Sequence, residues 1–115
     1  CVVFCDDLDK LNLAEIGPLF ENNELFPDRV NTEFVEVMGR NQLRMRVWER
    51  GNGETLACGT GACASAVAAV LCGYADKDTD IKVRLLGGEL TIRYTDDAVF
   101  MIGECSKVFD GIVEI

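Results

Sequence analysis

The stretch from Glu49 to Cys72 constrains the fold more than any other, because it joins a glycine-rich turn to an unusually apolar segment. The turn reads Cys58-Gly59-Thr60-Gly61, and Ala62 to Cys72 then contains only Ala, Val, Leu, Cys and one Ser. Gly73 follows, and glycine readily adopts the left-handed conformation that ends helices, so we predict a helix over 61–72. A helix that is apolar on every side is normally buried on every side. The rest of the chain should therefore wrap around it.

The position of Cys58 directly before this helix indicates a reactive thiol. The free N–H groups of Gly59, Thr60 and Gly61 can point at an anion, and the positive end of the helix dipole favours a thiolate. The chain has no histidine, which excludes a Cys-His nucleophile. Two chemistries remain, namely proton transfer by the thiol itself and nucleophilic attack assisted by a carboxylate such as Glu49. The competing interpretation is a small buried thiol at a tight turn.

Composition narrows the class of protein. A chain of 115 residues holds one domain with one modest core, and no apolar run reaches membrane-spanning length. The start of the chain does not resemble a signal peptide. The net charge of −9 argues against nucleic-acid binding and is typical of a soluble protein. We interpret the six cysteines as free thiols in a reducing cytoplasm. We expect no metal site, because histidine is absent and no close cysteine pair is matched by a second.

Periodicity and turn residues predict an α+β fold, a curved and mostly antiparallel sheet or barrel around the central helix. A second helix over Leu13–Glu21, with Asn12 as its cap, should follow a loop at Asp6–Asn12. The turns should lie at 39–41, 87–88 and 95–97. The predicted strands are Cys1–Cys5, Val30–Met38, Leu43–Trp48, Ile81–Leu85, Leu90–Tyr94, Val99–Ile102 and Lys107–Ile115.

A dinucleotide-binding loop is the weaker interpretation of the same glycines. The segment Gly59–Ala64 formally matches the Gly-x-Gly-x-x-Gly/Ala pattern. That pattern requires a buried parallel strand before it and an acidic residue at the end of the next strand. Here Asp80 comes before the next strand, and the strands that follow form a hairpin, so the sequence disfavours nucleotide binding.

The segment Glu49–Gly61, Glu-Arg-Gly-Asn-Gly-Glu-Thr-Leu-Ala-Cys-Gly-Thr-Gly, resembles the C-terminal signature of the diaminopimelate epimerase family. Phe26–Val35 and Gly103–Gly111 resemble further segments of that family, so the similarity covers nearly the whole chain. Proline racemases share the fold and the Cys-Gly-Thr-Gly core, but they typically carry Ser-Pro where this chain has Leu56-Ala57.

The resemblance implies a role for each matching residue. Cys58 matches one of two cysteines that face opposite sides of the substrate α-carbon, where one thiolate removes a proton and the other thiol delivers one, without pyridoxal phosphate. The backbone at Gly59 and Thr60 matches the site that holds the reacting carboxylate. Asn31 and Arg50 match residues that grip the distal end of the substrate, whereas by residue type alone they are a strand-edge residue and a salt-bridge partner. Glu49 matches a residue that assists the cysteine pair and lines the pocket.

The implied reaction is the interconversion of LL- and meso-diaminopimelate in lysine and peptidoglycan-precursor biosynthesis. The alternatives are a racemase or isomerase of another small amino or hydroxy acid on the same scaffold, and a non-catalytic binding or structural module. We leave the other five cysteines as structural: Cys1, Cys5, Cys63, Cys72 and Cys105.

The family is built from two similar halves, and residues 1–115 correspond to the C-terminal half without its first strands. The motif that carries the partner cysteine is absent, as is an Asn-Pro-His segment expected just before Cys1. We therefore expect this piece alone to be unable to epimerise. We also expect it to expose apolar surface and to associate, with the other half or as a homodimer.

Overall fold

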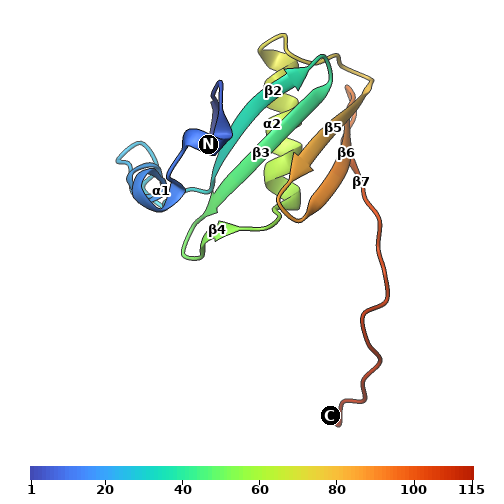
Figure 1. Cartoon of the computed structure of the whole chain (residues 1–115). Coiled ribbons are helices and arrows are strands. Elements are labelled where there is room, and N and C mark those ends of the chain that lie inside the picture. Colours follow the sequence, from blue (N-terminus) through green and yellow to red (C-terminus); the bar gives the residue numbers. More distant parts are fainter.

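The computed structural model describes all 115 residues and contains a seven-stranded mixed sheet with helices on both of its faces (Figure 1). The strands are ordered β1-β2-β3-β5-β6-β7, and β4 pairs with β3 outside this path. In chain order the elements are β1 (Val2–Phe4), the 3-10 helix η1 (Leu8–Lys10), α1 (Leu13–Glu21), β2 (Thr32–Gly39), β3 (Gln42–Glu49), β4 (Gly53–Thr55), α2 (Gly59–Leu71), β5 (Asp80–Leu85), β6 (Gly88–Tyr94) and β7 (Val99–Ile102).

The sheet confirms the predicted α+β class but is open. Two strand pairs are parallel, β1 with β2 and β3 with β5, and the other four are antiparallel. The outer strands β1 and β7 do not pair with each other, so the barrel alternative was wrong. The strand that leads into α2 is the three-residue β4, which is antiparallel to β3 and unlike the buried parallel strand of a dinucleotide-binding unit.

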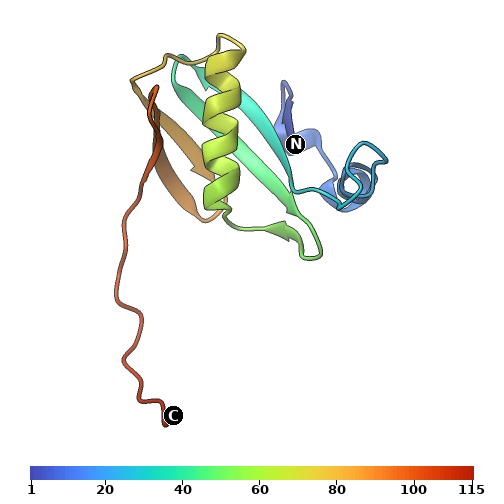
Figure 2. The same cartoon turned by 180° about the vertical axis from the view of Figure 1, so that it is seen from behind.

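Helix α2 lies across one face of the sheet and forms the main core there (Figure 2). Ala62, Ala66 and Ala69 are fully buried against sheet residues, and their small side chains let the helix approach the strands closely. The opposite side of α2 is exposed, and Leu71 is 74% accessible. Burial on every side was therefore a wrong expectation, because an open sheet covers only one side of a helix.

The residues at the two ends of α2 explain where the helix begins and ends. The helix begins at Gly59, two residues earlier than predicted, since Cys58 itself is the N-cap residue. At the other end Gly73 has a φ of +81°, which confirms the predicted left-handed termination.

The strand β3 shows the predicted alternation. Leu43, Met45 and Val47 are buried and belong to the core under α2. Arg44 and Arg46 face the other side, where Arg46 donates to Glu54 and to the carbonyl groups of η1 and its C-cap residue. The register pairs Glu33 of β2 with Val47, so Glu33 also faces α2.

A second, smaller cluster forms on the other face of the sheet, where Leu8, Leu13 and Phe34 are fully buried. The predicted helix over Leu13–Glu21 is confirmed, but the Asn12 side chain accepts no hydrogen bond from the helix and instead donates to Glu15. The predicted loop before it contains η1, because the Asp7 side chain accepts the N–H of Asp9 and caps this short turn.

The remaining differences concern the second half of the chain. The β5–β6 turn consists of Leu86 and Gly87, one residue before the predicted pair, with Leu85 opposite Gly88. The predicted strand at Lys107–Ile115 was wrong. This segment runs away from the sheet (Figure 1), so it has no neighbouring strand to bond with, and Phe109 is 81% exposed. Together with the exposed side chains of β7, it confirms the expected exposed apolar surface.

Replacing Gly17 with alanine will destabilise the fold. A Cβ at Gly17 would overlap the ring of Trp48, which packs from β3 against α1. Overpacking of this kind costs about 1–3 kcal/mol, which outweighs the ~1 kcal/mol that alanine gains in a helix. We therefore expect a lower thermal midpoint for this variant. Gly39→Ala, where a Cβ meets nothing within 4 Å, is the matched control and should leave the midpoint nearly unchanged.

Candidate active site

Cys58 lies at the N-terminus of α2, as predicted, and its sulfur is held by the helix itself. The Gly61 N–H donates to Sγ over 3.4 Å, and the Thr60 hydroxyl lies 3.6 Å from it. The residue is 9% exposed. A sulfur in this position receives both a hydrogen bond and the partial positive charge of the helix end, which stabilise a thiolate.

A hollow of about 380 Å³ opens beside this helix end. Three predicted site residues line it together, Asn31, Arg50 and Thr60. The other lining residues are Cys1, Arg29, Val30, Glu33, Gly61 and Ala64. Residues from β2, from the loop before it, from the β3–β4 turn and from α2 thus meet here, although they are far apart in the sequence.

Asn31 and Arg50 are fixed relative to one another. The Asn31 side-chain oxygen accepts the backbone N–H of Arg50 over 2.8 Å, and Nη1 of Arg50 donates to the Asp28 carbonyl over 2.8 Å. Arg50 forms no salt bridge, so the salt-bridge interpretation was wrong. Its guanidinium keeps further donors for an anion in the hollow.

Glu21 at the end of α1 holds the turn that carries Arg50. Its carboxylate accepts hydrogen bonds from the Trp48 indole over 2.8 Å, from Arg29 over 2.8 Å and from the Gly51 N–H over 3.0 Å. The Trp48 and Gly51 donors, with Arg29 beside them, lower the pKa of Glu21 from its ordinary value. No pattern in the sequence indicates this role for Glu21, because the role depends on α1 packing beside the turn.

Three predicted site residues do not line the hollow, namely Cys58, whose helix end lies beside it, Glu49 and Gly59. Glu49 accepts a hydrogen bond from the Thr55 hydroxyl over 2.5 Å. Its place on β3, two residues beyond Val47, puts it on the face that α2 covers. Gly59 is covered by Met101 of β7, whose Sδ would lie 2.9 Å from a Cβ built on that glycine. The roles of Glu49 and Gly59 therefore stay predictions.

Glu33 is a site residue that the sequence reasoning missed. Its Oε1 would lie 2.6 Å from a Cβ built on Gly61, and Sγ of Cys58 would lie 3.1 Å from the same point. Its side chain is 4% exposed. Burial, reinforced by the charge of Glu49, raises the pKa of Glu33, although the Cys1 ammonium group 3.7 Å away opposes this effect. The alternation that places Glu33 in line with Val35 was the available signal.

The two influences on the sulfur differ in size. A helix N-terminus stabilises an anion by about 0.3–1 kcal/mol and by about 2 kcal/mol in favourable, partly buried sites. A full negative charge a few ångströms away costs roughly 3–4 kcal/mol at the effective dielectric constant of a protein. An ionised Glu33 would therefore outweigh the helix end.

The other cysteines form no disulfide, and all six are free. Cys63 is half-buried in α2, and burial raises its pKa. Cys72 and Cys105, which were expected to be structural, are both exposed; Cys72 directly follows the last turn of α2. No three His, Cys, Asp or Glu side chains gather where they could share a metal ion. Neither α-helix has the length and apolar character needed to cross a membrane.

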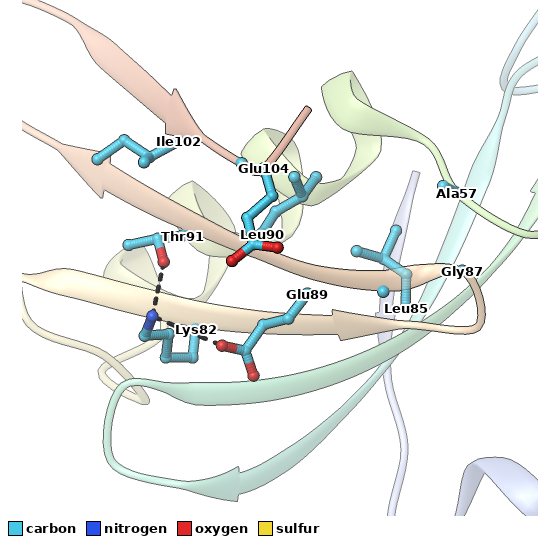
Figure 3. Close-up of a pocket in the computed structure, with 11 residues that line it drawn as sticks. Ala57, Lys82, Leu85, Gly87, Glu89, Leu90, Thr91, Ile102 and Glu104 are labelled. Carbon is cyan, nitrogen blue, oxygen red and sulfur yellow. Dashed lines mark hydrogen bonds and ion pairs between the residues drawn. The ribbon is translucent and has the colours of Figure 1, made fainter. Parts of the chain in front are cut away.

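A larger hollow of about 600 Å³ lies over the β5–β6 hairpin (Figure 3). Two of its charged groups, Lys82 and Glu89, are already engaged, since Lys82 donates to the Thr91 hydroxyl over 2.8 Å and lies 3.5 Å from Glu89. Neither Cys58 nor any other predicted site residue lines it. Size alone therefore does not identify the candidate site.

Comparison with known proteins agrees with this geometry. Residues 1–108 match the sequence family described as diaminopimelate epimerase. The chain is 53% identical to the diaminopimelate epimerase of Synechocystis sp. over its full length, 53% identical to that of Bacillus licheniformis over 96% of it, and 54% identical to that of Desulfovibrio desulfuricans over 96% of it. It spans only 41%, 39% and 38% of those three proteins.

Solved structures support the fold alone. The chain resembles phenazine biosynthesis proteins of the PhzF family from Bacillus anthracis and Enterococcus faecalis, with TM-scores of 0.57 and 0.63 and sequence identities of 22% and 15%. The similarity covers 80% and 85% of this chain and 29% and 34% of those proteins. With the family match over residues 1–108 and about half of all positions identical to named relatives, the chain belongs to the diaminopimelate epimerase family.

Proposed function

We propose that the protein containing this chain interconverts LL- and meso-diaminopimelate by proton transfer at the α-carbon, and that Cys58 is one of its two acid–base groups. The observation that carries the proposal is the sulfur of Cys58 at the start of α2, beside a hollow that holds Asn31 and Arg50. The curated relatives are diaminopimelate epimerases, and the chain spans about 40% of their length.

The chemistry follows from the charges around the hollow. Removing an α-proton places negative charge on the adjacent carboxylate, and backbone N–H donors at the helix start stabilise that charge. The free donors of Arg50 suit the planar carboxylate at the distal end of the substrate. Glu49, on the same sheet face as Glu33, would assist the thiol. The thiols supply the acid and base themselves, so the proposed reaction uses no pyridoxal phosphate.

The second face of the α-carbon requires a second acid–base group. This chain offers no second cysteine at a glycine-bracketed helix start. We therefore propose that residues 1–115 act as the C-terminal half of a two-half protein, whose other half supplies the partner cysteine. The exposed side of α2 and the exposed side chains of β7 are surfaces that such a half would cover. Six free thiols fit a reducing, cytoplasmic location.

The decisive experiment is exchange of solvent deuterium into the α-position of a panel of amino and hydroxy acids, using the complete protein. We expect exchange with diaminopimelate and none above background with proline or simple hydroxy acids. Exchange with a different member of the panel would identify another racemase on this scaffold. Binding without exchange anywhere in the panel would support the non-catalytic alternative. The separately expressed 115-residue piece should show no turnover.

A further inference from the structure

We propose that Glu33 is a positioning residue for Cys58, and that its buried carboxylate keeps Cys58 as a thiol, making it the proton donor of the resting enzyme. The role of Cys58 as a proton donor rests on the proposed function. The electrostatic effect itself concerns two side chains of this chain and is measurable without a substrate.

The fold brings the two groups together from separate elements. Glu33 projects from β2 toward α2, and Cys58 caps that helix, so both side chains converge on Gly61. Gly61 has no side chain, and the space that a Cβ would need is occupied by the carboxylate and the sulfur. The three heavy atoms nearest to this point all belong to these two side chains.

Opposing groups decide the protonation state of the sulfur. The Gly61 N–H and the Thr60 hydroxyl favour a thiolate, whereas an ionised Glu33 disfavours it. Cys63 on the same helix is a neutral thiol at neutral pH. Arg50 lines the hollow, but its Nη1 is engaged with the Asp28 carbonyl. A full charge outweighs partial charges at similar range, so the carboxylate dominates whenever it is ionised.

The groups around Glu33 determine in turn whether its carboxyl group is ionised. Burial and the charge of Glu49 raise its pKa above the ordinary 4.5, while the Cys1 ammonium and a backbone hydrogen bond favour the charged form. Where Cys1 follows another residue, a peptide N–H replaces that ammonium, and the pKa of Glu33 rises further. The sign of the effect is therefore fixed. Below its raised pKa Glu33 is neutral and does not oppose a thiolate at Cys58; above it, the carboxylate does.

The test is site-resolved alkylation of Cys58 with iodoacetamide in the complete protein, followed by peptide mass spectrometry from about pH 5 to pH 9, because only the thiolate reacts. We compare Glu33→Gln with the wild type. The ratio of their rates should be near one at the acidic end and rise to about tenfold or more once Glu33 is ionised. A ratio of one throughout would overturn the proposal.

Three variants make the result specific. Glu36→Gln removes a carboxylate from the same strand but the opposite face, where Glu36 pairs with Arg44, so its ratio should stay at one. Glu33→Asp keeps the charge and should remain close to the wild type, which separates charge from packing. If the ratio of Cys58 alkylation rates rises with pH for Glu49→Gln and not for Glu33→Gln, the proposal is also overturned. Alkylation of the exposed Cys72 is the internal standard. If the complete protein shows the expected alkylation ratios but no deuterium exchange with diaminopimelate, the proposed function fails and the effect of Glu33 on Cys58 stands.

Discussion

Cys58→Ser in the complete protein will lower the rate of α-proton exchange with diaminopimelate by about 10³-fold or more, while diaminopimelate still binds. Acid–base catalysis by a positioned group contributes about 10²–10⁴-fold, and a serine hydroxyl neither releases nor accepts a proton readily near neutral pH. Serine also preserves the cap, because its oxygen can accept the Gly61 N–H that Sγ now accepts. The fold should therefore survive the substitution.

Deuterium incorporation and calorimetric binding, measured on the same preparation, separate the two effects. Cys72→Ser is the matched control, since that thiol is exposed beyond the last turn of α2 and should exchange at the wild-type rate. Retention of exchange in Cys58→Ser would contradict a role for this sulfur in proton transfer. Loss of binding together with exchange would instead indicate that the hollow had collapsed.

Gly61→Ala will reduce exchange about 100-fold, although the substitution adds a single methyl group. That methyl would lie 2.6 Å from Oε1 of Glu33 and 3.1 Å from Sγ of Cys58, so the carboxylate and the sulfur must both move. A displacement of about 1 Å at a reacting group is enough for such a loss. The effect on stability is informative as well, because alanine at a helix position without this crowding would stabilise the protein by up to ~1 kcal/mol.

Kinetics and the thermal midpoint should be measured together for this variant. Gly39→Ala, a glycine in a strand with open space around it, should match the wild type in both. A Gly61→Ala protein that is more stable and equally active would show that the contact at Gly61 is loose. It would also weaken the case for Glu33.

The local elements were predictable where a single segment determines them. The alternation of Leu43, Met45 and Val47 identified both β3 and its buried face, and the Cys58–Gly61 turn predicted the start of α2 to within two residues. Asn31 and Arg50 came from resemblance alone, yet the structure places both at one hollow. Their hydrogen bond depends on β2 beginning beside the β3–β4 turn, which periodicity cannot reveal.

The errors arose where structure depends on distant partners. Apolar composition predicted that α2 would be buried all round, but the open sheet covers one side only. Lys107–Ile115 has the residues of a strand and no strand beside it. Glu33 was missed because its significance lies in its neighbour across space, the glycine of another element.

The parallel pairing of β3 with β5 has a consequence for how the site is assembled during folding. Parallel neighbours require a crossover, and here the crossover is the segment that contains β4, Cys58 and α2. The two strands cannot associate until that segment spans the sheet. The loss of chain entropy on closing this long loop therefore falls in a single, late step of folding. The carboxylate of Glu33 on β2 therefore reaches the sulfur at the start of α2 only when the crossover has docked on the sheet, and a nascent or partly unfolded chain keeps the two groups apart.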